Sequence, residues 1–545
     1  MRRSKRFPAL VVVLAMALVG AACGDDDDGG GGAQDTTAPA ATSAPGGTGG
    51  GATTTAPAPD DVDPDGVLRT YSDLASQGGH LFDGTKVGIA SMTAPHALVL
   101  GTLFRVNVDG SWEPELAESA EIVDPNTVRV VLREGVQFSD GTPYDAEAFK
   151  FNVERNRDAK HVNLSTELQE IENVTVENPT TATIHLKTPI AGAVYDRLPY
   201  VDFMFNSPTA IRAGQDVSTQ PVGAGPFLLT ARETGRIYRY EKNPNYWNAD
   251  NIRLAGVEII HAEPGQGPIN AIQAGDVDVS GSAFSYEQSK AIAGSGWEIE
   301  TSVTDNIMLW GQWCKSRPPF EDVRVRQAIN YAIDRDAINQ AVYDGNGEPM
   351  WGFFASESPL HDESLDGFYA YDPEKAKQLL AEAGQTDLTF DSFFTPGASQ
   401  RAVEIIQAQL AEIGVTLNPK PLLSSQDFFP DATGAPINIF QLERTGIQKV
   451  ARTLVPGSVG NICNWNDPEL NELVNQIKAL DPESSDAVSL WADLQRNTLE
   501  KAASLFVNFG VRAWAYNPDR VGDPNFLLNF QGRPEYDFYR MYIKA

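Results

Sequence analysis

The 545-residue chain has few residues of the types that bind metals or haem. It contains 3 cysteines and 6 histidines, and the histidines are scattered along the sequence. Zinc and haem sites draw on such ligands at short, regular spacing. The sequence therefore predicts no metal site and no cofactor.

Basic residues are also scarce. Lys and Arg number 42 against 73 Asp and Glu, which gives a formal net charge of −31. Nucleic acids are bound mainly through Lys and Arg contacts to phosphate. The charge balance argues against a nucleic-acid partner and favours a soluble chain.

Long apolar runs are missing, because none reaches the roughly 20 residues that a membrane span needs. The longest, Phe7–Val19, follows a basic start and leads to Gly20-Ala21-Ala22. This order is typical of an export signal. Cys23 comes next and resembles the lipidated cysteine of a bacterial lipobox, although Gly20 stands where that pattern usually has Leu or Val. We expect residues 1–22 to be a lipoprotein signal peptide and Cys23 to carry lipid; ordinary secretory cleavage near Ala22 is the alternative.

Residues 24–66 contain almost no large apolar side chains. They are rich in Asp, Gly, Thr, Ala and Pro. Such a segment cannot bury enough apolar surface to offset its ordering entropy. We expect residues 23–66 to form a disordered tether that leads to a folded body from Val67.

The body, residues 67–545, is too long for a single core and predicts two or more lobes. Its two cysteines, Cys314 and Cys463, can pair in an exported protein, but their spacing does not show whether they meet.

The first half of the body has strand and helix signals in alternation. Thr127–Leu132 is a β-branched strand, and Asp145 caps a following helix. Residues 173–186 predict an antiparallel pair, and 227–240 and 257–261 predict further strands. A short helix, 269–274, precedes a predicted strand at 276–279.

The second half indicates a parallel sheet covered by helices. Asp372-Pro373 and Asp467-Pro468 each place a cap before a proline at the first helical position. Strand 388–394, helix 399–413 and strand 415–417 form a βαβ unit. The predicted fold class is therefore α/β.

Several sequence blocks, in this order, resemble the family 5 extracellular solute-binding proteins of ABC importers, the peptide- and nickel-binding group. The blocks are Glu113–Ser119, Leu132–Pro143, Pro221–Phe227 with Asn243–Trp247, Pro318–Asp336, Tyr371–Gly384 and Gln407–Gly414. The resemblance covers about residues 112–480. It implies a binding protein without catalysis, not an enzyme.

The resemblance implies a two-lobed, periplasmic-binding-protein-like clamp with an inserted subdomain. Lobe I would comprise 67–108, 215–305 and 510–545, the inserted subdomain 109–214, and lobe II 306–509. A peptide or other small organic solute would bind between the lobes. The partners would be an ABC permease and ATPase, with the protein a monomer held by its lipid at the outer face of the cytoplasmic membrane.

The candidate ligand contacts are residues in segments that line the cleft in proteins of this family. They are Met92, Trp310, Trp313, Trp351, Phe353, Phe440, Glu443, Arg444, Asn464 and Trp465. Burial in the core is the alternative for Met92 and for Trp310 and Trp313. Peptide-binding members hold the peptide's amino group with an Asp after the strand near 440, but residues 445–453 contain no acid and instead carry Lys449 and Arg452.

Three alternatives remain. An exported hydrolase would need a nucleophile and base in one cleft, and the sequence has neither a Gly-x-Ser-x-Gly elbow nor a zinc motif. A lipid-anchored sensor or adhesin that has lost its transporter would have the same sequence features. Nickel or haem binding, as in some relatives, has little support from six unclustered histidines.

Overall fold

The computed structural model describes residues 61–75, 80–86, 94–108, 110–160, 166–263, 265–281, 284–394, 398–422, 437–443, 446–458, 461–528 and 534–545. The expected signal peptide and Cys23 lie outside this part of the chain. The last residues of the expected tether are described, and they meet the C-terminal end. The Asp63 amide donates to the carbonyl of Ile543 at 2.8 Å, and the Ala545 amide donates to that of Asp61 at 2.7 Å. Order therefore begins before Val67.

A four-stranded sheet follows these N-terminal residues. Its order is β1–β10–β9–β8, and β1 and β10 are parallel while the other pairs are antiparallel. The strands are β1 (Val67–Ser72), β8 (Phe227–Glu233), β9 (Ile237–Lys242) and β10 (Gly256–His261). The sheet thus joins a strand at the start of the body to three strands that come much later in the sequence.

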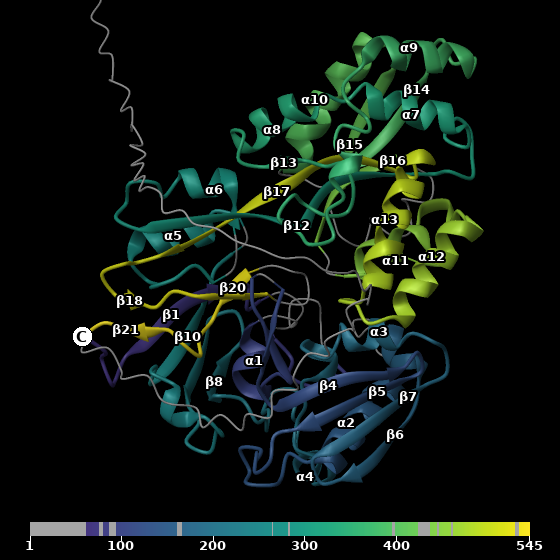
Figure 1. Cartoon of the computed structure of the whole chain (residues 1–545). Coiled ribbons are helices and arrows are strands. Elements are labelled where there is room, and N and C mark those ends of the chain that lie inside the picture. Colours follow the sequence, from purple (N-terminus) through teal and green to yellow (C-terminus); the bar gives the residue numbers. More distant parts are fainter. Residues whose placement is uncertain are drawn as a thin grey trace, which may run out of the picture. The chain divides into compact units, whose positions relative to one another are not determined.

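A second four-stranded sheet, β4–β5–β7–β6, is antiparallel throughout. Its strands are β4 (Ala117–Asp124), β5 (Thr127–Leu132), β6 (Ile171–Asn178) and β7 (Thr181–Leu186). Helix α2 (Ala146–Ala159) lies against it (Figure 1) and begins at Asp145, whose side chain accepts from the Ala148 amide. The predicted pair at 173–186 and the predicted cap are confirmed.

The largest sheet has seven strands, in the order β11–β17–β12–β16–β14–β15, with β13 paired to β17. These are β11 (Phe284–Ser285), β12 (Glu298–Trp313), β13 (Glu348–Pro349), β14 (Thr389–Phe394), β15 (Thr416–Pro421), β16 (Ile437–Glu443) and β17 (Ser504–Tyr516). Strands β14 and β15 are parallel and are joined through helix α10 (Ala398–Glu412), so the predicted βαβ unit is confirmed.

Two of the remaining helices begin at the caps that the sequence predicts. Asp372 and Asp467 cap α9 and α12 through their side chains, and a proline follows each cap. The helices are α1 (Ala94–Leu100), α3 (Ala191–Tyr195), α4 (Pro208–Arg212), α5 (Gly267–Ala274), α6 (Tyr286–Lys290), α7 (Val323–Tyr331), α8 (Arg335–Tyr343), α9 (Pro373–Glu382), α11 (Gln448–Leu454), α12 (Pro468–Ala479) and α13 (Ser485–Glu500). Buried apolar side chains of these helices and of the sheets form several hydrophobic clusters.

The predicted strand at 276–279 does not form. Only an isolated bridge joins Val279 to Tyr516. Single backbone bonds still hold the segment, among them one from the Asp278 amide to the Arg69 carbonyl at 2.8 Å. The buried Asp278 carboxylate also accepts from the backbone and guanidinium of Arg69 and from Arg520.

Three two-stranded antiparallel sheets complete the strand inventory of the described residues. They are β2 (Phe104–Val106) with β3 (Trp112–Pro114), β18 (Val521–Gly522) with β21 (Tyr542–Ile543), and β19 (Phe526–Leu528) with β20 (Pro534–Tyr536). Within the part of the chain that the structure describes, every helix is too short or too polar to span a membrane.

Candidate functional site

The described part of the chain contains a cleft of about 560 Å³. This volume lies in the range of small-molecule sites, which is about 300–1,000 Å³. Segments far apart in the sequence supply its walls, among them Val106, Trp112, Gly192, Asp196, Tyr200, Val303, Phe354, Ser358, Gly446, Lys449, Ile477 and Trp491. We call this cavity the cleft.

Aromatic rings form two parts of the cleft wall. The Trp112 ring stacks on Tyr195 with centroids 4.7 Å apart and an interplanar angle of 13°. In another part of the wall, Phe354 meets Trp491 edge-on at 5.0 Å. Each ring is held by a neighbour, so the cleft offers rigid apolar surface to a ligand.

A carboxylate and an ammonium also line the cleft. Asp196 follows the last turn of α3, and its Oδ2 atom is buried and accepts no hydrogen bond from the described residues. Burial raises the pKa of Asp196 to about 6, although Arg197 and Lys449 oppose the shift. The Lys449 ammonium lies 4.6 Å from the centre of the Phe354 ring.

Gly446 allows the Asp196 side chain to reach its position. A Cβ at residue 446 would collide with the carboxylate. The φ of +48° at this position is also one that residues other than glycine rarely adopt. The carboxylate from α3 thus lies directly against the turn that precedes α11.

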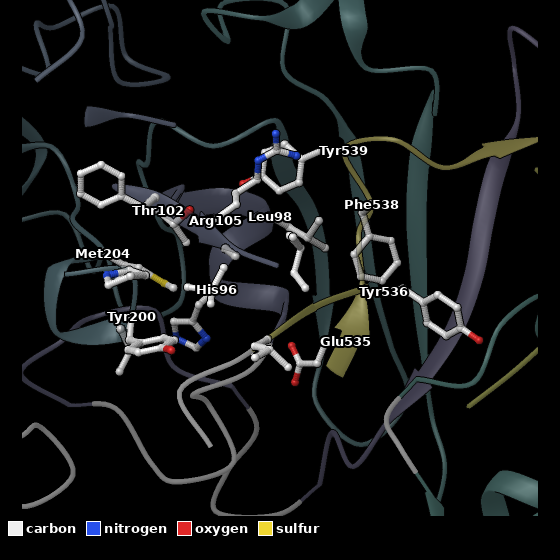
Figure 2. Close-up of a pocket in the computed structure, with 17 residues that line it drawn as sticks. His96, Leu98, Thr102, Arg105, Tyr200, Met204, Glu535, Tyr536, Phe538 and Tyr539 are labelled. Carbon is white, nitrogen blue, oxygen red and sulfur yellow. The ribbon is translucent and has the colours of Figure 1, made fainter. Parts of the chain in front are cut away.

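A smaller cavity of about 80 Å³, which we call the side pocket, is drawn in Figure 2. The two cavities share Val106, Tyr200 and Leu528. Helix α1 contributes His96 and Leu98, β2 contributes Arg105, and the C-terminal segment contributes Phe538 and Tyr539.

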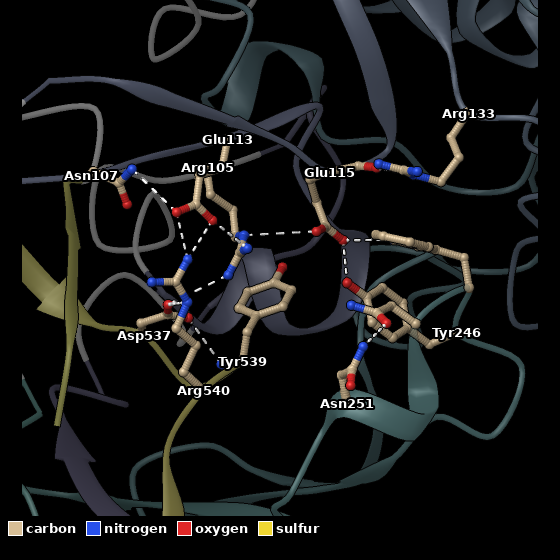
Figure 3. A network of polar contacts seen from close by, with 12 residues as sticks. Arg105, Asn107, Glu113, Glu115, Arg133, Tyr246, Asn251, Asp537, Tyr539 and Arg540 are labelled. Atoms are coloured by element: carbon tan, nitrogen blue, oxygen red, sulfur yellow. Dashed lines mark hydrogen bonds and ion pairs between the residues drawn. The ribbon is translucent and has the colours of Figure 1, made fainter. Parts of the chain in front are cut away.

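A network of charged side chains fixes one wall of the side pocket (Figure 3). Arg105 donates to Glu113 at 2.6 Å and lies 3.8 Å from Glu115. The Arg105 guanidinium also lies 3.4 Å from Asp537 and 5.0 Å from the ring centre of Tyr539. The network therefore joins the β2–β3 hairpin to the C-terminal segment.

Glu115 is a deeply buried acid of this network, with 1 % of its surface exposed. It accepts hydrogen bonds from the Tyr246 hydroxyl and, at 3.0 Å, from Trp247 Nε1. Burial raises its pKa, while Arg105 and the two donors act against that shift.

The residues chosen from the sequence lie mostly away from the cleft. Trp310, Trp313 and Phe353 are fully buried, and Trp310 meets Phe353 edge-on at 6.3 Å. Strand β12, which carries both tryptophans, has β16 on one side and β17 on the other, and core side chains cover its faces. The two tryptophans therefore pack in the core, which is the alternative that the sequence left open for them.

Trp351, Asn464 and Trp465 are likewise absent from the cleft wall. The Arg335 guanidinium lies 4.8 Å from the Trp351 ring centre, and the Lys315 ammonium lies 4.6 Å from that of Trp465. The Asn464 side chain accepts from the Gly457 amide at 2.6 Å. These contacts give each side chain a structural partner.

The other candidates fall where the structure gives no side-chain description. Met92 and Arg444 lie outside the described residues. Phe440 and Glu443 belong to β16, of which the backbone alone is described at these positions. Their contact with a ligand stays a prediction.

Cys314 and Cys463 form a disulfide with an S–S distance of 1.95 Å and a Cα–Cα distance of 5.2 Å. It ties the end of β12 to the loop before α12, a pairing that the sequence left open. Among the described residues, no group of three or more His, Cys, Asp or Glu side chains is placed to hold a metal ion.

A comparison with protein families identifies the chain. A model of the bacterial extracellular solute-binding proteins, family 5, matches residues 111–448, which is more than half of the 545 residues. The chain belongs to this family. Its members are binding proteins, so the expectation of a protein without enzymatic activity is confirmed.

One curated relative is the glutathione-binding protein GsiB of Shigella flexneri serotype 5b. It is 28% identical over 320 residues, which cover 57% of this chain and 62% of the relative. The chain therefore matches less than two thirds of the relative's length.

Two solved structures show the same fold. The ABC transporter substrate-binding protein CtaP of Listeria monocytogenes has a TM-score of 0.74 at 20% identity, over 88% of this chain and 100% of that one. NikA of Brucella suis, solved with Fe(III)-EDTA, also has a TM-score of 0.74, at 22% identity and the same coverage. The mixed α/β fold predicted from the sequence is thus confirmed.

Proposed function

We propose that this protein is the substrate-binding component of an ABC importer and captures a peptide or another small organic solute in the cleft. The observation that carries the proposal is the cleft itself, with one stacked and one edge-on aromatic pair at its walls and opposite charges at Asp196 and Lys449. Family membership and the names of the relatives support a transported solute. The walls hold no nucleophile–base pair among the described lining residues, and a binding role needs none.

Binding between separate walls would couple occupancy to closure. The inserted segment that carries Asp196 and the segment that carries Lys449 would act as parts of a two-lobed clamp, with lobe boundaries as expected from the sequence. A ligand that contacts both parts stabilises the closed form by its differential affinity. A lipid on Cys23 and the tether would keep the loaded protein near its permease and raise the local concentration.

Calorimetric titration tests the proposal. Glutathione, mixed oligopeptides and Fe(III)-EDTA would be titrated into the wild-type protein and into two variants, Ser358→Trp and Ser356→Trp. Ser358 lines the cleft, whereas the exposed Ser356 does not.

We expect saturable one-site binding of at least one solute class to wild type and to Ser356→Trp. Ser358→Trp should lose it, because the indole fills space that the ligand needs. Equal binding to both variants would place the ligand elsewhere, and no heat from any class or from an extract of the host's small molecules would count against a binding role.

The lipid anchor needs its own test. Replacing Cys23 by Ser should release the protein into the medium without changing its affinity for solute. Retention of that variant in the membrane fraction would contradict the anchor.

A further inference from the structure

The charged groups that line the cleft are unequally exposed. Among the described lining residues, Asp196 and Glu357 are acids and Lys449 is a base. Lys449 is only 1 % exposed, and its ammonium lies over the Phe354 ring. Asp196 is partly exposed and Glu357 is exposed. The cleft therefore presents carboxylates to a ligand more fully than it presents the ammonium.

The Asp196 carboxylate has no hydrogen-bond donor among the described residues. Its Oδ2 is buried against Gly446 and accepts no hydrogen bond, and none is made by Oδ1 within the described chain. The rest of the residue is partly exposed and forms cleft wall. A carboxylate without a donor at a cavity wall is costly, and a donor supplied by a ligand recovers part of that cost.

The charges around Asp196 do not balance. Three carboxylates and two cations interact here among the described side chains, namely Glu167, Asp196 and Asp202 with Arg197 and Lys449. Arg197 Nε donates to Asp202 at 2.7 Å, so this cation already has a partner. Three acids against two bases leave one negative charge uncompensated among these side chains. A cation on a ligand would offset the cost of burying it.

An aromatic surface lies next to this carboxylate. Trp112 lines the cleft, and its ring stacks on that of Tyr195, the residue that precedes Asp196. Burial raises the pKa of Tyr195, and Asp481 and Glu483 add to the shift, so negative charge surrounds the stacked pair. The negative face of an aromatic ring attracts cations. This part of the wall thus favours a positively charged group for a second reason.

We propose that the transported solute carries a cationic N–H group, an ammonium or a guanidinium, and that Asp196 accepts its hydrogen bond near the Trp112 ring. The inference rests on the proposed function and narrows its ligand class to organic solutes with a positively charged group. The buried ammonium of Lys449 balances part of the acidic charge instead of recruiting an anion.

Three small probes with the same phenyl body test the sign of the charge. Phenethylammonium is a cation, phenethyl alcohol is neutral and hydrocinnamate is an anion. Each would be titrated into the full-length protein at neutral pH while the Asp196 carboxyl carbon is followed by NMR. Phenethylammonium should shift this resonance saturably and bind about tenfold more tightly than the alcohol, as a charge-assisted hydrogen bond predicts. Hydrocinnamate should bind more weakly than the alcohol.

Two variants that each remove one acid provide the matched control. Asp196→Asn should lower the calorimetric affinity for phenethylammonium about tenfold, to that of the alcohol. Glu118→Gln removes an exposed acid of β4 outside the cleft lining and should leave the affinity unchanged. Equal affinity of wild type for the cation and the alcohol, tighter binding of hydrocinnamate, or the same affinity in both variants would overturn the inference.

The pH dependence gives a second readout on the wild-type protein. Burial raises the pKa of Asp196 to about 6, with Glu167 adding to the shift and Arg197 and Lys449 opposing it. Affinity for phenethylammonium should therefore rise as the pH increases through this value and Asp196 loses its proton. Affinity for the alcohol should stay constant, and a parallel change for both probes would contradict the role of Asp196.

The same titrations separate this inference from the proposed function. If a solute from host extract binds wild type and Asp196→Asn equally well, the cleft does not use Asp196 to hold a cation and the binding role stands. If no solute binds wild type at all, the proposed function itself fails.

Discussion

Glu115 is a buried acid and Asp196 is a partly buried one, and their surroundings differ. Glu115 sits in a network in which Tyr246, Trp247 and Arg105 face its carboxylate. Asp196 borders the cleft, and its Oδ2 accepts no hydrogen bond from the described residues. Burial raises the pKa of both groups. A satisfied buried acid indicates structure, whereas an unsatisfied one at a cavity indicates a place for a ligand.

The largest expected effect comes from removing the satisfied acid. Glu115→Ala leaves two buried donors, the Tyr246 hydroxyl and the Trp247 indole, without their acceptor. The free energy of unfolding should fall by about 2–5 kcal/mol. Denaturant unfolding followed by tryptophan fluorescence measures it.

Glu115→Gln is the control, because its amide oxygen can still accept one of the two bonds. Its loss should be clearly smaller. If Glu115→Ala unfolds at the wild-type denaturant concentration, the network has no structural role and the comparison fails.

The unsatisfied acid should behave in the opposite way. Asp196 has a folded-state pKa of about 6, above its ordinary value of 3.8. The native state therefore binds more protons than the unfolded state in this window, and stability falls as pH rises from about 4 to 6. Asp196→Asn removes this term and should raise the free energy of unfolding by about 1–2 kcal/mol at pH 8, with no gain near pH 4.

Thermal unfolding of both proteins across this pH range checks the prediction. The affinity for solute should fall in the same variant, because Asp196→Asn removes a charge from the cleft wall. A variant that is less stable than wild type at pH 8 would show that Asp196 has a stabilising partner, contrary to the comparison.

The smallest expected effect concerns Lys449. Its ammonium opposes the upward pKa shift of Asp196. Lys449→Met should therefore raise the pKa of Asp196 further, by roughly half a pH unit. Titration of the Asp196 carboxyl carbon by NMR would detect it, and an unchanged or lower pKa would mean that the two side chains do not interact.

Much of the fold could be predicted from local signals. Asp372 and Asp467 cap helices because a side-chain carboxylate before a proline satisfies backbone amides in any context. The βαβ unit at 389–421 follows from alternating periodicity in the same way. The segment 276–279 was misjudged because Asp278 is held by two arginines from remote parts of the chain, which no local pattern records.

The site could be predicted less well. Trp310 and Trp313 attract attention as large aromatic residues, but their places in an interior strand bury them. Asp196, Trp112 and Trp491 reach the cleft only through tertiary structure, and nothing at those positions in the sequence distinguishes them. For Lys449 the sequence did offer an indication, since this residue lies in a stretch where peptide-binding relatives have an acid.

The central claim is that the cleft holds a small organic solute, and mass spectrometry tests it most directly. The protein would be purified from its native host, denatured, and the released small molecules identified for wild type, Ser356→Trp and Ser358→Trp. We predict one solute in near-stoichiometric amount from wild type and from Ser356→Trp, and its loss from Ser358→Trp. The same solute released in equal amount from all three proteins would contradict the claim.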